Sequence, residues 1–250
     1  MTSRSIRNSP FMLLAVGIVG SFLLFVTIAA NYVMQDSFVA FDLHIAQLLF
    51  ASRAQLPLHF YYAVTVLMNA TTVLCTGALL TFLLWRQHAA IYVFTLWLAL
   101  TGSTSLMLLA KSFFQRSRPV NFLPIVSETS YSFPSGHATI AVILFGFLAY
   151  LFAREQRSWL TRFCIIGSAA VMIFLIDVSR LYLGVHYVSD VLAGNALGFT
   201  VLLASIAIGE WHLAHHTEKL PHIRKSVFLS VVLTQIACLL SFLFFTPLEF

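Results

Sequence analysis

The stretch IYVFTLWLALTGSTSLMLLA, residues 91–110, contains no Asp, Glu, Lys or Arg. A helix needs about 20 apolar residues to cross the hydrocarbon core of a bilayer. The sequence has five charge-free windows of about this spanning length or longer: residues 8–35, 54–85, 87–110, 191–209 and 226–248. The sequence therefore predicts an all-α membrane protein.

Two shorter charge-free windows, 138–153 and 163–176, reach spanning length when their ends extend through His137 and Arg180. With these two, we expect one membrane domain, residues 1–250, built as a multi-pass transmembrane helical bundle of seven spans. The apolar core of the first window exceeds the roughly 7–15 residues of a signal peptide, so we expect a retained span there.

Residues 36–55 lie between the first two spans and differ from them in pattern. Their apolar residues recur at helical spacing, and charged residues stand between them. This pattern predicts an amphipathic helix that lies on the outer membrane surface.

The composition excludes a soluble fold. Only 9% of the residues are charged, whereas about a quarter of a soluble domain is charged. The formal net charge is +5, but no soluble basic domain is present that would bind nucleic acid. We therefore expect the lipid bilayer and its lipids as partners, and no nucleic acid. The oligomeric state is left open by the sequence.

The positive charges of the loops predict the orientation, because Lys and Arg are enriched on the cytoplasmic side. With the N-terminus inside, the inner loops hold Arg4, Arg7, Arg86, Arg154, Arg157, Arg162, Lys219, Arg224 and Lys225. The outer side then holds Arg53, Lys111, Arg116, Arg118 and Arg180. We therefore expect a cytoplasmic N-terminus, in a membrane that is most simply a bacterial plasma (inner) membrane.

The inner segment 210–225 is rich in histidine, and His212 and His216 are one helical turn apart. A metal site is conceivable at that spacing, but neither Glu210 nor Glu218 completes a zinc pattern. We therefore favour a solvated linker, and we expect no metal site and no cofactor.

Three short stretches on the predicted outer side carry polar chemistry: KSFFQRSRP (111–119), YSFPSGHAT (131–139) and SRLYLGVHYVSD (179–190). Each alone also fits a structural role, such as a snorkelling cation or a helix N-cap. Together they bring cations and a helix N-terminus to one membrane face. Guanidinium groups and backbone N–H groups suit a tetrahedral oxyanion, so these stretches predict a phosphate site.

These stretches match a three-part pattern in order and spacing: Lys-x6-Arg-Pro, Pro-Ser-Gly-His and Ser-Arg-x5-His-x3-Asp. The sequence resembles the type 2 phosphatidic acid phosphatase superfamily, which also includes vanadium-dependent haloperoxidases and glucose-6-phosphatase. The resemblance covers the phosphatase core with the three motifs, residues 57–209, and extends to the first span and the 36–55 helix, so that it implies a core of six membrane helices. The window 226–248 lies beyond it as an extra, seventh C-terminal span.

The resemblance implies a role for each motif residue. His186 is expected to be the nucleophile that forms a phosphohistidine, and Asp190 to accept the other ring N–H. His137 is expected to protonate the leaving oxygen and then to activate water. The groups expected to bind the phosphoryl oxygens are Lys111, Arg118, Ser135, Gly136 and Arg180. Asp177, three residues before Arg180, is placed by spacing where it can hold that guanidinium.

The function expected from this resemblance is that of a metal-independent lipid phosphatase with its site on the extracytoplasmic side. Its substrate would be a lipid phosphate or diphosphate monoester such as undecaprenyl diphosphate, phosphatidylglycerol phosphate or phosphatidic acid. One alternative is a phosphotransferase that passes the phosphoryl group to a second lipid. Another is a non-catalytic transporter or binder of anionic lipids, which explains the cations but not the two histidines.

Overall fold

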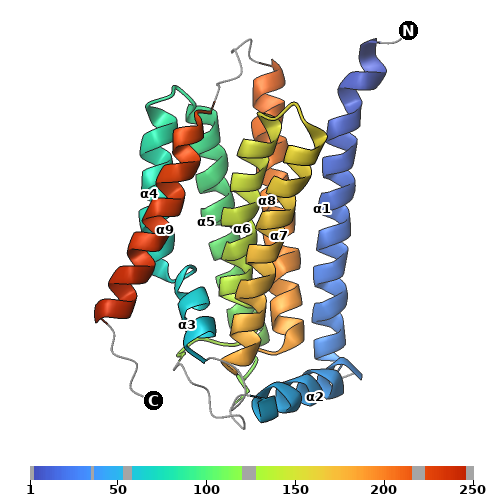
Figure 1. The fold of residues 1–250 in the computed structure, drawn as a ribbon. Coiled ribbons are helices and arrows are strands. Elements are labelled where there is room, and N and C mark those ends of the chain that lie inside the picture. The colour runs from blue at the N-terminus through green and yellow to red at the C-terminus, as the bar shows by residue number, and fades with distance from the viewer. Residues whose placement is uncertain (1–2, 35–36, 53–57, 120–127, 216–222, 246–250) are drawn as a thin grey trace.

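The computed structural model of the chain describes residues 3–34, 37–52, 58–119, 128–215 and 223–245, and these residues form helices and no strands (Figure 1). The helices are α1 (Ser3–Val33), α2 (Ser37–Ser52), α3 (Leu58–Val66), α4 (Ala70–Trp85), α5 (Ala90–Phe114), α6 (Gly136–Arg154), α7 (Trp159–Tyr182), α8 (Val188–His215) and α9 (Lys225–Phe245). The all-α prediction is confirmed.

By length and composition, α5, α6, α7, α8 and the Phe11–Val33 part of α1 can each cross a membrane. The two short windows do extend through His137 and Arg180, as expected, to become α6 and α7. The predicted second span is divided into α3 and α4, which make a sixth span if they act as one. In α9, the apolar part Ser226–Phe242 is shorter than the helices that meet this length, so the described residues provide up to six of the seven expected spans. The boundaries of the phosphatase core stay a prediction.

The α3–α4 pair bends by 42°, and polar side chains stabilise the bend. Asn69 caps α4 by accepting the Ala70 N–H at 3.0 Å. Thr72 donates its hydroxyl to the carbonyl of Val66 at 3.0 Å, and the same carbonyl accepts the backbone N–H of Asn69 at 3.0 Å. The bend lets α3 lean onto α7, with which it packs.

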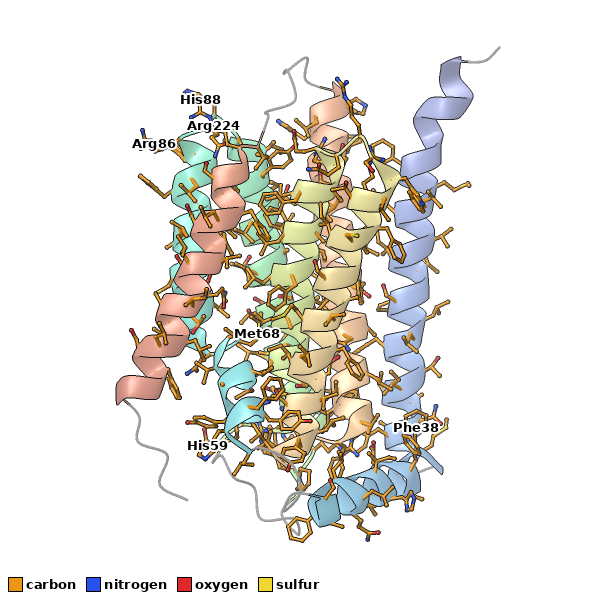
Figure 2. The ribbon with its side chains drawn as sticks, in the orientation of Figure 1. Phe38, His59, Met68, Arg86, His88 and Arg224 are labelled. Carbon is orange, nitrogen blue, oxygen red and sulfur yellow. The ribbon has the colours of Figure 1, made fainter. Side chains whose placement is uncertain are left out.

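Helix α6 forms the centre of the bundle and packs on α5, α7 and α8, while α1 packs along α8 and α9 along α4. Its side chains Val142, Leu144 and Phe147 are completely buried. Large apolar side chains cover the outside of the bundle, where Figure 2 shows them along every helix. Phe113 and Trp159, for example, are 79% and 78% exposed. Such a surface fits lipid rather than water, since exposing apolar area to water costs about 25 cal/mol per Å².

One end of the bundle is crossed by α2, which lies nearly across the other helices at the bottom of Figure 1. We call this the motif end, because α5 ends there and α6 and α8 begin there. The opposite end, where α1 begins and α8 finishes, is the far end. Of the predicted segment 36–55, residues Ser37–Ser52 form a helix, and its place on the outer membrane surface stays a prediction. One side chain of α2, Asp42, is only 2% exposed.

Helix α8 approaches the start of α6 closely at Gly194. A Cβ at this position would lie 2.5 Å from the backbone oxygen of Ser135, a distance that atoms cannot adopt. The backbone N–H of Ser135 also donates to the carbonyl of Asp190 at 2.9 Å. Because Gly194 has no side chain, the second motif, at the start of α6, can pack directly against α8, which carries the end of the third motif.

Candidate active site

The three motifs meet at the motif end although they are far apart in sequence. The first occupies the last turn of α5 and the segment that follows it. The second opens α6, and the third runs from the end of α7 into α8. Because α5, α7 and α8 all contact α6, these ends come together.

A left-handed residue turns the first motif back toward the bundle. Gln115 has φ 46° and ends α5, and its N–H donates to the carbonyl of Lys111 at 3.0 Å. The chain then carries Arg116 and Arg118 across the start of α8. Lys111 itself is 6% exposed and donates its ammonium group to the carbonyl of Tyr131.

The third motif places His186 and Asp190 together, with a serine between them. His186 Nδ1 is 3.6 Å from Asp190 Oδ2, which is longer than a hydrogen bond. Ser132 Oγ fills the gap, because it lies 3.2 Å from His186 Nδ1 and donates to Asp190 Oδ2 at 2.5 Å. The N–H of Tyr187 donates to the same oxygen at 2.9 Å. Ser132 therefore connects His186 to Asp190, a contact that was expected to be direct.

The other ring nitrogen of His186 faces Arg118. The distance from His186 Nε2 to the Arg118 guanidinium is 3.3 Å. That guanidinium is held by the carbonyls of Ser130, at 2.7 Å, and Val185, at 2.9 Å. With Nδ1 on the side of Asp190, Nε2 is the nitrogen left to face a ligand.

Arg180 is 1% exposed and points at an unexpected partner. Its guanidinium donates to Thr65 of α3 at 2.8 Å and to the carboxylate of Glu128. Glu128 also lies 3.7 Å from the guanidinium of Arg118, so one carboxylate bridges two of the predicted phosphate-binding cations.

The expectation that Asp177 holds Arg180 is wrong. The carboxylate of Asp177 instead accepts from the side chain of Asn195 at 2.6 Å. A spacing of three residues on α7 is compatible with an ion pair, but Asn195 of α8 and Glu128 supply closer partners to the two side chains.

Two buried donors near the motifs lack a partner among the described residues, namely the hydroxyl of Ser135 and Nε of Arg180. Ser135 is completely buried just before α6. Because a buried donor without a partner costs about 1–3 kcal/mol, such groups indicate a place for a ligand.

Gly136 and His137 open α6 beside these donors. The cations that act electrostatically on His137 are Arg180, Arg118 and Lys111, and His186 acts on it as well. His137 therefore lies at the same end of the bundle as His186, close enough for their charges to interact. A Cβ at Gly136 would lie 2.9 Å from the sulfur of Met107, so packing against α5 restricts this position.

Burial and neighbouring charges set the pKa values of His186 and Glu128, two groups that lie outside the spans. Burial lowers the pKa of His186 from 6.5 to about 4, although the nearby carboxylate of Asp190 raises it in part. His186 is therefore a neutral imidazole at neutral pH. The pKa of Glu128 is lowered, because the attraction of Arg180 and Arg118 outweighs the desolvation that raises it. Glu128 is therefore a carboxylate.

The structure adds to this cluster five residues that the sequence motifs do not indicate: Asp42, Thr65, Arg116, Glu128 and Ser132. Arg116 was counted only as an outer cation, and Ser132 carries no recognisable signal. Asp42 gave one weak signal, as a charge on an otherwise apolar helix. The other partners follow from contacts across 50 or more residues, which a sequence pattern does not contain.

Among the residues that the structure describes, no three His, Cys, Asp or Glu side chains gather as a metal site. The histidine pair considered at the far end falls partly outside them, since His216 is not described. The absence of a cofactor stays a prediction.

Comparison with known proteins bears directly on these motifs. The family model of the PAP2 superfamily matches residues 88–213, half of the chain, and this range includes all three motifs. The chain belongs to the PAP2 superfamily. It is therefore a multi-pass membrane protein of this family, as its apolar helices already indicate.

Individual PAP2 proteins resemble the chain over shorter stretches. It is 41% identical to phosphatidylglycerophosphatase B of Bacillus subtilis over 90 residues, which are 35% of this chain and 43% of that protein. It is 34% identical to undecaprenyl-diphosphatase of Sulfolobus acidocaldarius over 96 residues, which are 36% of this chain and 42% of that protein. The chain thus spans less than half the length of these curated relatives.

A solved structure resembles most of the bundle. The crystal structure of a transmembrane PAP2 type phosphatidylglycerolphosphate phosphatase from Bacillus subtilis matches with a TM-score of 0.64 and 26% identity. The match covers 78% of this chain and 97% of that chain. The PAP2 fold therefore extends well beyond the motifs.

Proposed function

We propose that this PAP2 protein is a metal-independent lipid phosphatase that works through a phosphohistidine. The observation that carries the proposal is the orientation of His186. Its Nδ1 faces Ser132 and Asp190, and its Nε2 faces the guanidinium of Arg118 at 3.3 Å. A neutral imidazole with its free nitrogen beside a cation is placed to attack an anionic phosphorus centre.

The cations supply the electrostatics that phosphoryl transfer requires. Charge spreads over the phosphoryl oxygens in the transition state, so catalysis depends on donors that are already in position. Arg118, Arg180 and Lys111 provide positive charge, and the unpartnered hydroxyl of Ser135 and Nε of Arg180 provide free donors. The N–H of Gly136, at the start of α6, is a further donor.

In the first step, His186 Nε2 donates its lone pair to phosphorus as the bond between phosphorus and the leaving oxygen breaks. His137 transfers a proton to that oxygen, and Asp190 with Ser132 stabilises the positive imidazole ring. In the second step, His137 accepts a proton from water, whose oxygen attacks phosphorus. The bond from phosphorus to nitrogen breaks, and its electron pair returns to His186.

We propose a lipid phosphate or diphosphate monoester as the substrate. The names of the relatives point to phosphatidylglycerol phosphate and undecaprenyl diphosphate, and phosphatidic acid belongs to the same chemical class. All three place an anionic phosphate at the membrane surface with an apolar tail in the bilayer. A site at the end of an apolar bundle fits that geometry.

The proposed activity is tested by phosphate release from the purified protein in detergent, with phosphatidic acid, phosphatidylglycerol phosphate and undecaprenyl diphosphate as substrates. We expect release in the presence of EDTA, and inhibition by vanadate, which imitates five-coordinate phosphorus. Complete loss in EDTA that Mg²⁺ restores would contradict the mechanism. Transfer of phosphate to an added acceptor lipid instead of water would indicate the phosphotransferase.

We further propose that the motif end faces the extracytoplasmic side, on the basis of the loop charges. The test places single cysteines at Thr129, near the motif end, and at Arg86, which Figure 2 shows at the far end, after the three native cysteines are replaced by alanine. A membrane-impermeant thiol reagent should label Thr129→Cys in intact cells and Arg86→Cys only after lysis. The reverse labelling would place the site in the cytoplasm.

Both positions suit this experiment because they are exposed. Ser189, which the orientation also places outside, does not suit it because it is 2% exposed.

A further inference from the structure

Arg116 stands between the two motif cations Lys111 and Arg118 but makes a different set of contacts. One terminal nitrogen of its guanidinium lies 2.7 Å from Asp190 Oδ1 and 2.6 Å from the hydroxyl of Ser189. The other terminal nitrogen lies 2.8 Å from Asp42 Oδ2. One planar fork thus binds two carboxylates, one at the start of α8 and one on α2.

The side chains of Asp42, Arg116 and Asp190 form a row of alternating charge, and all three are buried. Arg116 is 6% exposed, Asp42 2% and Asp190 0%. The guanidinium also lies between two aromatic rings, 4.7 Å from the centroid of Tyr32 and 4.4 Å from that of Tyr187. Charges in such surroundings interact strongly, and removing one leaves the others unpaired at a high cost.

Asp42 ties α2 to the first turn of α8 by more than the ion pair. Its Oδ1 accepts the backbone N–H of Ser189 at 2.9 Å, and its Oδ2 also accepts the hydroxyl of that serine. This contact joins residues that are 147 apart in the sequence. The neighbouring residue of Ser189 is Asp190, so α2 contacts the turn that carries the catalytic carboxylate.

We propose that Asp42 and Arg116 are positioning residues, which hold Asp190 ionised and in register with His186 through a buried row of alternating charge. The surface helix α2 thereby becomes part of the active site rather than a cover over it. This inference rests on the proposed function, because it assigns the row to the histidine chemistry described above.

The effect of the row follows from the groups that surround Asp190. The charged and titratable groups that act on it or on Arg116 are Lys111, Arg118, His186, Tyr187 and Asp42. The guanidinium of Arg116 touches the carboxylate of Asp190 directly. Without Arg116, Asp42 and Asp190 face each other as buried like charges, and one of them takes up a proton at a higher pH. A protonated Asp190 no longer stabilises the imidazolium of His186.

The test compares Arg116→Met, Asp42→Asn and the double variant of both by the pH profile of kcat/KM, with p-nitrophenyl phosphate and phosphatidic acid as substrates. Arg154→Met is the matched control, because Arg154 also bonds a carboxylate and lies near two tyrosine rings, but at the far end. Thermal unfolding of each purified variant measures its loss of stability separately.

For Arg116→Met, we expect kcat/KM to fall about 10- to 100-fold, the size of coupling inside one charge network. The acid limb of the profile should rise by about one pH unit or more, as for paired carboxylates. In the double variant the like-charge pair is gone, so the limb should return toward that of the wild type and activity should exceed that of Arg116→Met. Arg154→Met should keep the wild-type profile.

If Asp42 and Arg116 have a purely structural role, the double variant should be no more active than Arg116→Met. The acid limb of the pH profile should then stay at its wild-type position in every variant. That result would overturn the inference and leave the proposed function standing. A wild-type protein that releases no phosphate would instead overturn the proposed function, and this inference with it. If Arg116→Met does not fold, Asp42→Asn decides, and a wild-type kcat/KM with a wild-type pH profile in this variant would overturn the inference.

Discussion

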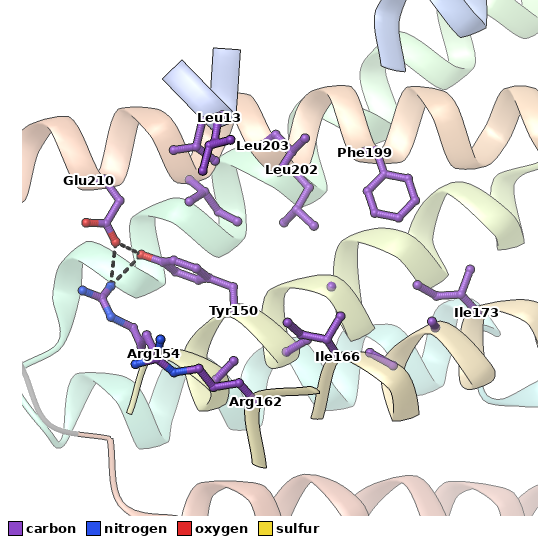
Figure 3. Close-up of a pocket in the computed structure, with 17 residues that line it drawn as sticks. Leu13, Tyr150, Arg154, Arg162, Ile166, Ile173, Phe199, Leu202, Leu203 and Glu210 are labelled. Atoms are coloured by element: carbon purple, nitrogen blue, oxygen red, sulfur yellow. Dashed lines mark hydrogen bonds and ion pairs between the residues drawn. The ribbon is translucent and has the colours of Figure 1, made fainter. Parts of the chain in front are cut away.

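The two ends of the bundle each hold an arginine that lies near two tyrosine rings and bonds a carboxylate. At the far end, Arg154 bonds Glu210 at 2.8 Å and the hydroxyl of Tyr150 at 2.6 Å, as the dashed lines of Figure 3 show. At the motif end, Arg116 bonds Asp42 and Asp190. The chemical groups are the same, so their presence alone does not distinguish a functional cluster from a structural one.

The surroundings of the two clusters differ. The carboxylate of Asp190 uses its second oxygen for Ser132, which in turn contacts His186. Glu210 instead lies at one end of a cavity of about 720 Å³, whose lining in Figure 3 is apolar along α6, α7 and α8, with side chains such as Ile166, Ile173 and Phe199. The side chains of the far-end pair are also more exposed: Arg154 and Glu210 are 19% and 29% exposed, whereas the side chains of Arg116 and Asp190 are 7% and 0% exposed. What the carboxylate touches besides arginine therefore separates the two ends.

The largest expected difference between the ends concerns the nucleophile. His186→Ala should lower phosphate release about 10⁴-fold or more, because removal of a nucleophile leaves only the binding contribution. His215→Ala, a change in an exposed histidine of the far end, should leave the rate within about twofold, since isolated surface changes are close to neutral. Equal losses of phosphate release in the two variants would contradict the assignment of His186 as the nucleophile.

The second expected effect separates the two histidines of the motif end. His137→Ala should lower the initial release of a lipid alcohol about 10²–10⁴-fold, the usual contribution of a general acid. p-Nitrophenolate leaves without a proton, so the burst of phenolate from p-nitrophenyl phosphate should be much less impaired. His186→Ala should be inactive on both substrates. If both variants lose the same factor on both, the assignment of acid and nucleophile is wrong.

A third effect concerns pH. Since burial lowers the pKa of His186 to about 4, the ring stays neutral as the pH falls from 7 to 5.5. A histidine with its pKa at 6.5 would be about 90% protonated at pH 5.5 and would lose about tenfold in rate. We expect no such loss in kcat, after correction for the second ionisation of the substrate phosphate. A limb near pH 6.5 would show that His186 is solvated in the working enzyme.

The smallest effect compares two glutamates that each bond an arginine. Glu128→Gln should tighten inhibition by vanadate about three- to tenfold, because a carboxylate that bridges Arg118 and Arg180 repels an incoming anion. Glu210→Gln, the equivalent change at the far end, should leave vanadate inhibition unchanged. Weaker inhibition in Glu128→Gln would mean that Glu128 mainly holds Arg180 in place for the phosphate.

The sequence predicted the spans and the motif residues for a physical reason. A run without charge is sufficient to place a helix in a bilayer, and the short spacing of His186 and Asp190 brings them together where the chain enters α8, with His186 just before the helix and Asp190 in its first turn. The bend at Asn69 was not predicted, because the window 54–85 is apolar on both sides of it. Its signal, an asparagine before two threonines, is recognisable only once a helix start is suspected there.

The partners of the motif cations were less accessible to such reasoning. Arg180 was given Asp177 as its partner because they are close in sequence, but its contacts are Thr65 and Glu128. These lie 115 and 52 residues away. The packing of the helices determines which charged residues meet in a buried ion pair, and this packing cannot be read from a single sequence.

The contact at Gly194 has a consequence for how this site can evolve. The chain can exchange most lipid-facing side chains for others of similar hydrophobicity without altering the spacing of the motifs. At position 194, a single methyl group would lie 2.5 Å from the carbonyl oxygen of Ser135 and 3.1 Å from Ala138. A lineage that lost this glycine would have to shift α8 against α6 and separate Asp190 from Ser135, so its return to activity would require the reversion itself or a coordinated change on both helices.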